Sequence, residues 1–216
     1  MPLPNRVDPF GNLLADPARG TFMGNRGGRI HDAGRRLSQR RWASRQWICC
    51  VLAFNNRHRA VWGEGYTELF FLDEPTAFAA GHRPCFECRH ADAAAFAQAF
   101  GKEADVAGRH MAGQRMRADA MDRILHGERL EGRRKRLHRL AIEALPDGAA
   151  ITLDSYTVLM LRAGRLLRWS PSGYADAGPR PRGITVDTLT PPAIVQVLAN
   201  GYRPVWHVSA DEICTL

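Results

Sequence analysis

The sequence predicts a mixed α+β protein in which helices pack on two small antiparallel sheets. Three observations predict this class. Short apolar runs bounded by turn residues indicate strands, and capped helical segments follow two of these runs. A Cys-x-x-Cys motif, formed by Cys85 and Cys88, stands between two of the predicted helices. This motif is typical of a zinc knuckle, which completes the predicted fold.

The composition is that of a folded protein. The 216 residues can bury a sizeable core, and apolar residues at 45% and charged residues at 24% are close to globular averages. The sequence contains no uncharged apolar run of roughly 18 residues, and its first residues, Met1 to Arg6, lack the apolar segment of a secretory signal. We therefore expect a cytoplasmic protein that does not associate with membranes.

The charge balance predicts a polyanionic partner. A net charge of +8 and a pI near 9.8 favour binding to phosphates, and nucleic acid is the obvious candidate. Almost every basic residue is Arg, however, because Lys occurs only at Lys102 and Lys135, and Ala is abundant. A GC-rich genome would produce the same bias, so the composition alone leaves nucleic-acid binding open.

The first half of the chain predicts one sheet and two helices. Residues 1–41 are rich in Pro, Gly and Arg and indicate mostly loop, an arm packed on the core. The apolar run 47–54 predicts a buried strand, and the runs 58–62 and 67–72 predict two more strands around a glycine turn. Together these runs predict a small antiparallel sheet.

Capping residues define the helices on either side of the knuckle. Asp73 stands at an N-cap, Pro75 lies in the first turn, and Gly81 suits the left-handed position after the last turn, so we expect a helix over 74–80. The Ala-rich stretch from His90 to Phe100 predicts the second helix.

The second half predicts basic helices followed by a meander. The polar and basic stretch 105–140 favours one or two surface helices, and strands are expected at 150–153, 156–161, 165–169 and 184–189. Residues 170–183 are loaded with Gly and Pro and indicate a loop. Thr190 is expected to cap a helix with Pro191 at its first position and Gly201 after its end.

These elements suggest three regions. We expect residues 1–104 to form a zinc-knuckle α+β region with a Gly/Arg-rich N-terminal arm. Residues 105–145 form a basic helical segment, and residues 146–216 form a β-meander plus helix that packs on the first region.

The cysteines predict a Zn²⁺ site. Zinc takes four tetrahedral ligands, so Cys85 and Cys88 supply half a site and Cys49 and Cys50 are the remaining thiol candidates, because Cys214 lies in a tail that we expect to fray. Successive strand residues point to opposite faces, so only one of the adjacent cysteines faces the knuckle unless a bulge intervenes. The other donors considered are His31, His58 and His82.

Two alternative interpretations of the cysteines remain. Buried cysteine often acts as a small hydrophobe, which would account for Cys49 and Cys50. Cys85 and Cys88 could instead be a redox dithiol, although the strand that precedes such a motif in a βαβ unit is missing.

The stretch 70–89 resembles a known zinc domain. It contains the run Gly81-His82-Arg83-Pro84-Cys85-Phe86-Glu87-Cys88-Arg89 after a strand and a short helix. This is similar to the second half of the zinc-binding domain of Ada-type methylphosphotriester DNA repair proteins, which have Gly-x-Arg-Pro-Cys-x-x-Cys-Arg. The resemblance makes 1–104 an Ada-like region with Cys85 and Cys88 as its second ligand pair.

The first half of that domain is less well matched. In the family, four cysteines bind zinc and one of the upstream pair takes a methyl group from a DNA phosphotriester. The family separates these two cysteines by several residues, whereas Cys49 and Cys50 are adjacent and farther from the knuckle. By resemblance, Cys49 or Cys50 would be the zinc-activated nucleophile.

Basic residues near the knuckle and in the stretch 126–138 are the predicted nucleic-acid contacts. They are Arg83, Arg89, Arg129, Arg133, Arg134, Lys135 and Arg136. A charge run is also typical of a solvated helix face, and that interpretation stays open.

The sequence thus predicts a zinc-binding, nucleic-acid-binding protein with a role in DNA repair or maintenance. The alternative is a zinc- or cysteine-dependent enzyme that acts on nucleic acid or nucleotides by alkyl transfer or deamination. Deamination needs a His-x-Glu upstream of the cysteines, but His126 and Glu128 lie downstream. A protein-interaction module is a third possibility.

Overall fold

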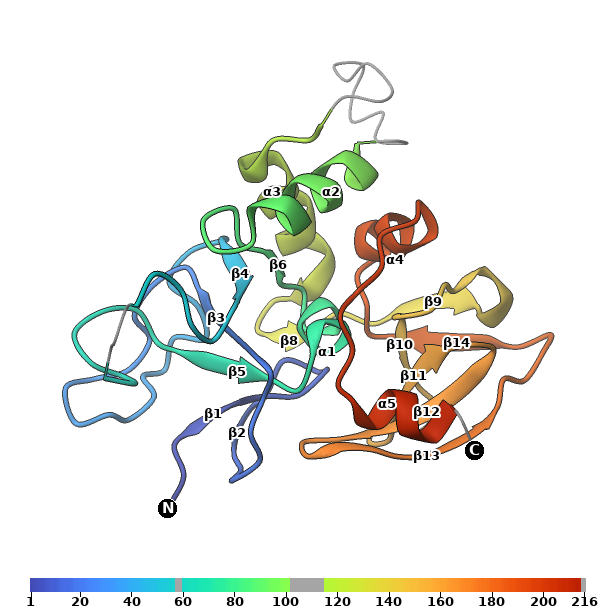
Figure 1. The fold of residues 1–216 in the computed structure, drawn as a ribbon, viewed down its shortest axis with the longest axis horizontal. Coiled ribbons are helices and arrows are strands. Elements are labelled where there is room, and N and C mark those ends of the chain that lie inside the picture. Colours follow the sequence, from blue (N-terminus) through green and yellow to red (C-terminus); the bar gives the residue numbers. More distant parts are fainter. Residues whose placement is uncertain (57–59, 102–114, 215–216) are drawn as a thin grey trace.

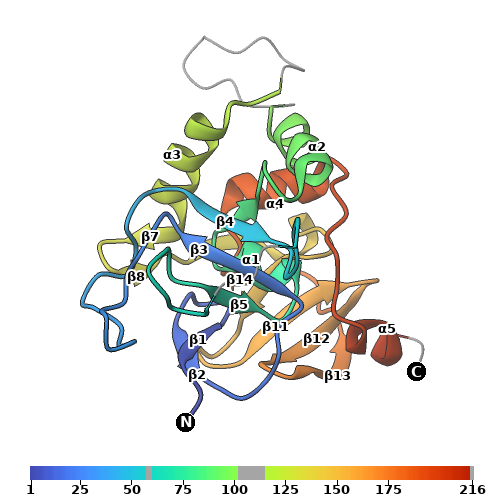
Figure 2. The same ribbon diagram turned by 60° about the vertical axis from the view of Figure 1, so that its left-hand side comes forward.

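The computed structural model describes residues 1–56, 60–101 and 115–214, and it contains both helices and sheets (Figure 1). Two six-stranded sheets lie on either side of a short central helix. Figure 2 shows further helices gathered on one side of the sheets. The broad α+β class therefore agrees with the expectation from the sequence.

The first sheet has the strand order β2-β1-β5-β3-β4-β6. Its strands are β1 (Pro4–Val7), β2 (Leu13–Ala15), β3 (Phe22–Arg26), β4 (Trp47–Cys50), β5 (Leu69–Phe71) and β6 (Arg83–Pro84). The pairs β1–β5 and β4–β6 are parallel and the others are antiparallel. The expectation of a purely antiparallel sheet was wrong here, because the chain passes through a helix before β6 and returns alongside β4 in the same direction.

The N-terminal arm contains three strands where we expected mostly loop. In β3, Met23 lies opposite Cys50 of β4 and Phe70 of β5, so the strand is held by two partners distant in sequence. Gly24 looked like a loop residue, but a Cβ there would collide with the carbonyl of Ile48 on β4. The glycine therefore permits close approach of two strands.

The other strands of the first sheet are shorter than predicted. The strand expected over 47–54 ends at Cys50, and that expected over 67–72 spans Leu69–Phe71. Residues 58 and 59 of the strand expected over 58–62 lie outside the described residues, and 60–62 are not a strand. Trp62 instead takes a left-handed conformation with φ +59°, and its backbone N–H donates to the Glu68 carboxylate at 2.7 Å.

The central helix α1 (Glu74–Ala79) begins where the caps predicted. The Asp73 carboxylate accepts a hydrogen bond from the backbone N–H of Thr76 at 3.0 Å, which satisfies a donor of the first turn. Gly81 has φ +86° after the helix. Every residue of α1 is buried, so this helix belongs to the interior rather than to the surface.

Three helices pack beside one another around an aromatic core. They are α2 (His90–Phe100), α3 (Ala118–Arg129) and α4 (Pro192–Ala199). Phe78 of α1 contacts Phe96 and Tyr202, with ring centroids 5.4 and 5.6 Å apart, and joins α1 to this group. None of the helices in the described part of the chain is long and apolar enough to cross a membrane.

Part of the predicted basic helical segment has a different structure. Residues 102–114 lie outside the described residues, and α3 is followed by a hairpin and a strand rather than by a second helix. The hairpin consists of β7 (Leu130–Glu131) and β8 (Arg134–Lys135), and Gly132 with φ +61° makes its turn. The strand β9 (His138–Ala141) pairs with the second sheet, and its partner lies far along the chain.

The second sheet is antiparallel throughout, with the order β13-β12-β11-β10-β14-β9. Its other strands are β10 (Ala150–Thr152), β11 (Val158–Arg162), β12 (Arg165–Ser170), β13 (Gly173–Pro179) and β14 (Thr185–Thr188). The loop expected over 170–183 contains β13, an edge strand, which explains how it tolerates Gly and Pro. The tail forms a short helix, α5 (Ser209–Cys214), rather than fraying.

Thr190 has a different role from the expected cap. Its hydroxyl accepts a hydrogen bond from the Ala150 N–H at 2.9 Å, and the N-cap of α4 is Pro191. The threonine therefore joins the start of α4 to the second sheet.

Asp73 links the two halves of the molecule. Besides capping α1, its carboxylate accepts hydrogen bonds from the Tyr174 hydroxyl at 2.7 Å and the His207 N–H at 3.2 Å. Trp169 Nε1 donates to the Thr76 hydroxyl at 3.0 Å. The C-terminal region thus packs directly on the helix that precedes the cysteine motif.

Candidate metal centre

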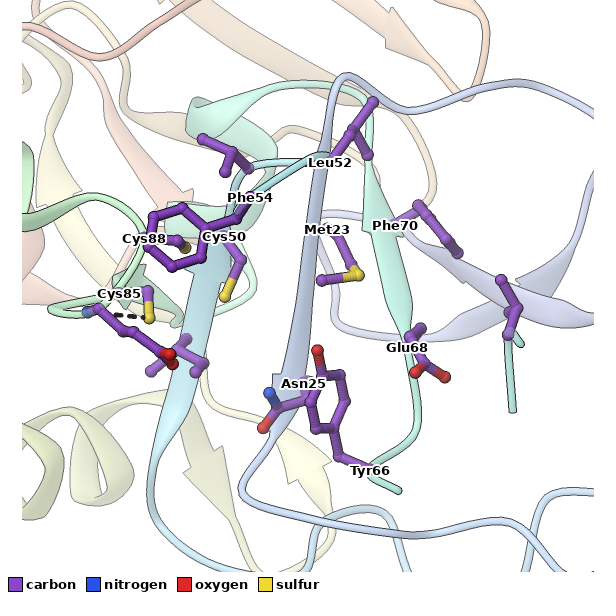
Figure 3. Close-up of a pocket in the computed structure, with 14 residues that line it drawn as sticks. Met23, Asn25, Cys50, Leu52, Phe54, Tyr66, Glu68, Phe70, Cys85 and Cys88 are labelled. Carbon is purple, nitrogen blue, oxygen red and sulfur yellow. Dashed lines mark hydrogen bonds between the residues drawn. The ribbon is translucent and has the colours of Figure 1, made fainter. Parts of the chain in front are cut away.

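Three sulfur atoms converge at one end of the first sheet. The sulfurs of Cys50, Cys85 and Cys88 all lie within 4.8 Å of one another. Cys50 is the last residue of β4, while Cys85 and Cys88 belong to the turn between β6 and α2. Figure 3 shows the three side chains directed toward one another.

Backbone pairing holds the turn in place. β6 lies parallel to β4, and the Cys85 N–H donates to the Cys49 carbonyl at 2.9 Å. The Arg89 N–H donates to the Cys85 carbonyl at 3.0 Å, which closes the turn that carries both knuckle cysteines. The two-residue strand β6 therefore sets the position of the knuckle relative to Cys50.

Cys49, a predicted ligand, is not part of this cluster. It is fully buried on the other face of β4, among Leu69, Phe71 and Ala77. Its sulfur accepts a hydrogen bond from Arg89 Nη1 at 3.6 Å. The alternation of strand side chains causes the separation, because no bulge intervenes to bring both cysteines to one face.

Two of the histidine donors considered, His31 and His82, do not join the cluster either. His31 shares hydrogen bonds with the Thr67 hydroxyl at 2.7 Å and the Gly63 carbonyl at 2.9 Å. His82 is buried between Trp47 and Phe71, with ring centroids 5.0 and 4.7 Å away. His58 lies outside the described residues.

The thiols perturb one another. The pKa of the Cys85 thiol is lowered, first by a hydrogen bond with Cys50 and then by one with Cys88. The Glu87 N–H, 3.4 Å from the Cys85 sulfur, adds to this effect. The same hydrogen bond with Cys85 is the main cause of the raised pKa of Cys50. The three thiols are thus coupled through direct hydrogen bonds.

The donor set suits a soft divalent ion. Two thiolates bound to a tetrahedral Zn²⁺ at about 2.3 Å lie roughly 3.8 Å apart. The separations of the three sulfurs, all within 4.8 Å, accommodate this geometry with small side-chain adjustments. Cys50, Cys85 and Cys88 would then hold the metal as thiolates, and binding would release their protons.

The cysteines also line a cavity of about 340 Å³. Its other lining is mainly apolar and comes from the strands β3, β4 and β5 and from the loops after β4 and before β5. Met23, Phe70, Leu52 and Phe54 are among these residues (Figure 3). Polar groups enter from Asn25, Tyr66 and Glu68. The sulfur cluster is therefore next to space that a small apolar group can occupy.

Arg83 and Arg89, predicted nucleic-acid contacts, are buried structural residues. Each is 4% exposed. Arg83 forms two hydrogen bonds to the Asp122 carboxylate, and Arg89 Nη1 lies 2.6 Å from a Glu74 carboxylate oxygen. These arginines connect the knuckle to α3 and α1, and their burial contradicts direct phosphate contact.

Arg129 is buried as well, with 1% exposure. Its guanidinium donates to the carbonyls of Gly81 and Arg45 at 2.8 and 2.7 Å. The remaining predicted contacts lie on or beside the β7–β8 hairpin: Arg133 and Arg134 are exposed, and Lys135 and Arg136 are partly exposed.

The His-x-Glu pair does not approach the cysteine cluster. The His126 ring packs edge-on against Trp42, with centroids 5.6 Å apart, and Glu128 accepts a hydrogen bond from the Ala193 N–H at 2.9 Å. The arrangement required for zinc-dependent deamination is therefore not assembled from these residues.

Arg26 and Arg41 are not among the predicted site residues. Both line a second cavity together with Arg129 and Lys135. The signal available in the sequence was the glycine-flanked run Asn25-Arg26-Gly27-Gly28, but an arginine between glycines does not reveal which distant cations it will meet.

Comparison of the chain with protein-family models, with curated proteins and with solved structures finds no match.

Proposed function

We propose that Cys50, Cys85 and Cys88 bind Zn²⁺ and that the protein is a zinc-stabilised nucleic-acid-binding protein. The observation that carries this proposal is the convergence of three sulfurs within 4.8 Å from segments separated by β5 and α1. Bound zinc would fasten the end of β4 to the turn before α2. A maintenance role for DNA agrees with the Ada-like spacing around Cys85 and Cys88.

The proposed nucleic-acid surface is the β7–β8 hairpin. Arg133, Arg134 and Arg136 are solvent-accessible there, and the chain has a net charge of +8. Exposed guanidinium groups attract phosphates and displace counterions. The buried Arg83 and Arg89 instead hold the scaffold together.

Metal content tests the site, and adjacent cysteines provide a matched pair of variants. We expect elemental analysis of the purified full chain to give about one zinc per chain. Cys50→Ser, Cys85→Ser and Cys88→Ser should lose most of it. Cys49→Ser should retain zinc, because Cys49 faces the opposite side of β4 and serine still accepts a hydrogen bond from Arg89. Full zinc occupancy in Cys50→Ser would contradict the assignment.

Salt-dependent binding tests the nucleic-acid proposal. We expect the affinity of the full chain for DNA to fall as salt rises, and each lost phosphate contact to reduce the slope of log K against log salt by about 1. Arg133→Gln with Arg134→Gln should weaken binding, while Arg168→Gln on the second sheet should not. Equal affinity of all three proteins would argue against the hairpin surface.

The apolar cavity beside Cys50 favours a second candidate, alkyl transfer. In that reaction the Cys50 sulfur forms a bond to the alkyl carbon of a phosphotriester, the carbon–oxygen bond breaks, and the phosphodiester leaves with the electron pair. Zinc would keep the sulfur deprotonated. Intact-mass measurement after incubation with methylphosphotriester DNA should show one added methyl group in the wild type and in Cys49→Ser, but none in Cys50→Ser.

A further inference from the structure

A strongly cationic cavity lies on the face of the first sheet opposite the cysteine cluster. Its volume is about 360 Å³. Trp47 and Arg26 line it, whereas their strand neighbours Ile48 and Asn25 line the cavity beside the cysteines. Strand alternation therefore divides the two sites between the two faces of β3 and β4.

Six basic residues line this cavity, and none of its described lining residues carries a carboxylate. They are Arg26, Arg41, Arg129, Arg133, Arg134 and Lys135. They come from four separate segments: β3, the loop before β4, the end of α3 and the β7–β8 hairpin. The folded chain thus brings cations together from across the sequence, which a solvated charge run does not do.

Two of these cations are almost completely buried. Arg26 is 2% exposed and Arg129 is 1% exposed, and their guanidinium groups lie 4.1 and 4.0 Å from the Trp47 ring. Arg26 Nη2 donates to the Gly11 carbonyl at 2.8 Å, and Arg129 also donates to carbonyls. Neutral carbonyls do not cancel the charge of a buried guanidinium.

Both guanidinium groups keep an unused donor. The Nε atoms of Arg26 and Arg129 are buried and have no hydrogen-bond partner among the described residues. Asp8 is the acidic group that acts on Arg26, and Asp122, which acts on Arg129, is already paired with Arg83. Buried donors of this kind normally have hydrogen-bond partners. A bound anion would supply the acceptors that the Nε atoms of Arg26 and Arg129 lack among the described residues.

The remaining groups around the cavity show the same excess of positive charge. Burial, and then the neighbouring Arg129 and Arg26, lower the pKa of Lys135 to about 7. Burial, and then repulsion by the same Arg26 and Arg129, lower the pKa of His82. An anion in the cavity would relieve this repulsion.

We propose that this cavity binds a small phosphorylated ligand, with the phosphate between Arg26, Arg129 and Lys135 and the organic part against Trp42. Arginine forks match phosphate oxygens, and lysine adds a point charge. The volume of about 360 Å³ falls within the size range of small-molecule sites. The backbone of a DNA duplex would reach the exposed Arg133 and Arg134 but not the buried pair.

This proposal is independent of the zinc site, whereas the rim of the cavity shares Arg133 and Arg134 with the proposed nucleic-acid surface. It is tested by calorimetric titration of the full chain with inorganic pyrophosphate and with a mononucleotide, at constant ionic strength. We expect saturable binding of both, weakened about tenfold or more in Lys135→Met, because a charge-assisted hydrogen bond is lost. Arg134→Gln, at the exposed rim, should weaken binding less. Methionine replaces the lysine stem without charge, so folding should be preserved.

The bound phosphate can belong to a free small molecule or to the end of a nucleic-acid strand. Oligonucleotides with and without a 5′ phosphate distinguish these two sources. Tighter binding of the phosphorylated form, lost in Lys135→Met, would support entry of a terminal phosphate into the same cavity. No saturable binding of pyrophosphate or mononucleotide, or equal affinities for wild type and Lys135→Met, would overturn the proposal. Trp fluorescence provides a second readout, because Trp47 contacts both buried guanidinium groups.

Discussion

Arg83 and Asp122 form a bidentate ion pair that connects β6, the strand before the cysteine knuckle, to helix α3. Arg83 Nε and Nη2 each lie 2.8 Å from a different oxygen of the Asp122 carboxylate, and both side chains are about 95% buried. The guanidinium also lies 5.4 Å from the Phe86 ring, within the knuckle itself. The position of the knuckle thus depends on a helix that begins thirty residues further along the chain.

We expect Arg83→Ala to reduce the free energy of unfolding by about 3–5 kcal/mol, because it leaves a buried carboxylate without its partner. The double variant Arg83→Ala with Asp122→Ala should lose less than the sum of the losses in Arg83→Ala and Asp122→Ala alone. Urea denaturation of the four proteins measures this coupling. Arg168→Ala is the matched control, since its ion pair with Asp176 is exposed and should change stability by less than about 1 kcal/mol. Additive losses would mean that the pair does not act as a unit.

Chelation should destabilise the protein if zinc is bound by the three cysteines. At a free zinc concentration 1,000-fold above the dissociation constant, binding adds about 4 kcal/mol to the free energy of unfolding. Removing the metal from wild type and from Cys49→Ser should therefore lower Tm in a thermal melt. Cys50→Ser should melt low with or without chelator, and a chelator-sensitive Cys50→Ser would contradict the ligand assignment.

The hydrogen bond between Tyr174 and Asp73 connects the second sheet to helix α1, and its contribution to stability can be measured. Its hydroxyl donates to the buried Asp73 carboxylate at 2.7 Å, so Tyr174→Phe should reduce the free energy of unfolding by about 1.5–3 kcal/mol. Tyr156 is 89% exposed, and Tyr156→Phe should have no measurable effect. Denaturant titration of both variants checks this expectation. Equal stability of the two variants would show that the bond to Asp73 contributes little.

The lowered pKa of Lys135 predicts how the stability of the protein depends on pH. Its pKa in the folded protein, about 7, lies below the usual value of 10.5, because of burial and then of Arg129 and Arg26, partly offset by Asp8. Between about pH 7 and pH 10.5, Lys135 is protonated in the unfolded chain but not in the folded protein. The contribution of Lys135 to the free energy of unfolding therefore rises with pH across this range. Arg41, Arg133 and Arg134 are the other basic residues that line the same cavity.

Lys135→Met should remove this part of the pH dependence and stabilise the protein most below pH 7. Denaturation of wild type and variant at pH 6 and pH 9 measures the difference. The same protonation should make the ratio of wild-type to Lys135→Met affinity for pyrophosphate larger at pH 6 than at pH 9. A parallel pH profile for the two proteins would contradict the assigned role of Lys135.

Features set by local residues were predictable from the sequence. The boundaries of α1 follow from Asp73, Pro75 and Gly81, which act within one or two turns of the helix. One feature of the cysteine cluster was also predictable. Strand alternation implied that Cys49 and Cys50 would face opposite sides of the sheet. Which of the two would face the knuckle depends on the pairing of β4 with β3 and β6, and the sequence does not display that pairing.

Features set by distant partners were not predictable. β3 contains Gly24 and Asn25 and lacks a strand-like composition, yet strands on both sides satisfy its backbone. Arg89 resembles a phosphate-binding residue in the sequence, but Glu74 neutralises it in the interior. A sequence pattern shows that a charge exists, whereas its burial and its partner are properties of the whole fold.

The complete burial of α1 has a consequence for biosynthesis. The Glu74 carboxylate accepts hydrogen bonds from the Tyr202 hydroxyl and from the Val205 N–H, 128 and 131 residues later in the chain. During translation this helix leaves the ribosome long before the residues that surround it exist. Its acidic side chain stays hydrated until then, and so the native arrangement around it can form only after Tyr202 and Val205 have emerged.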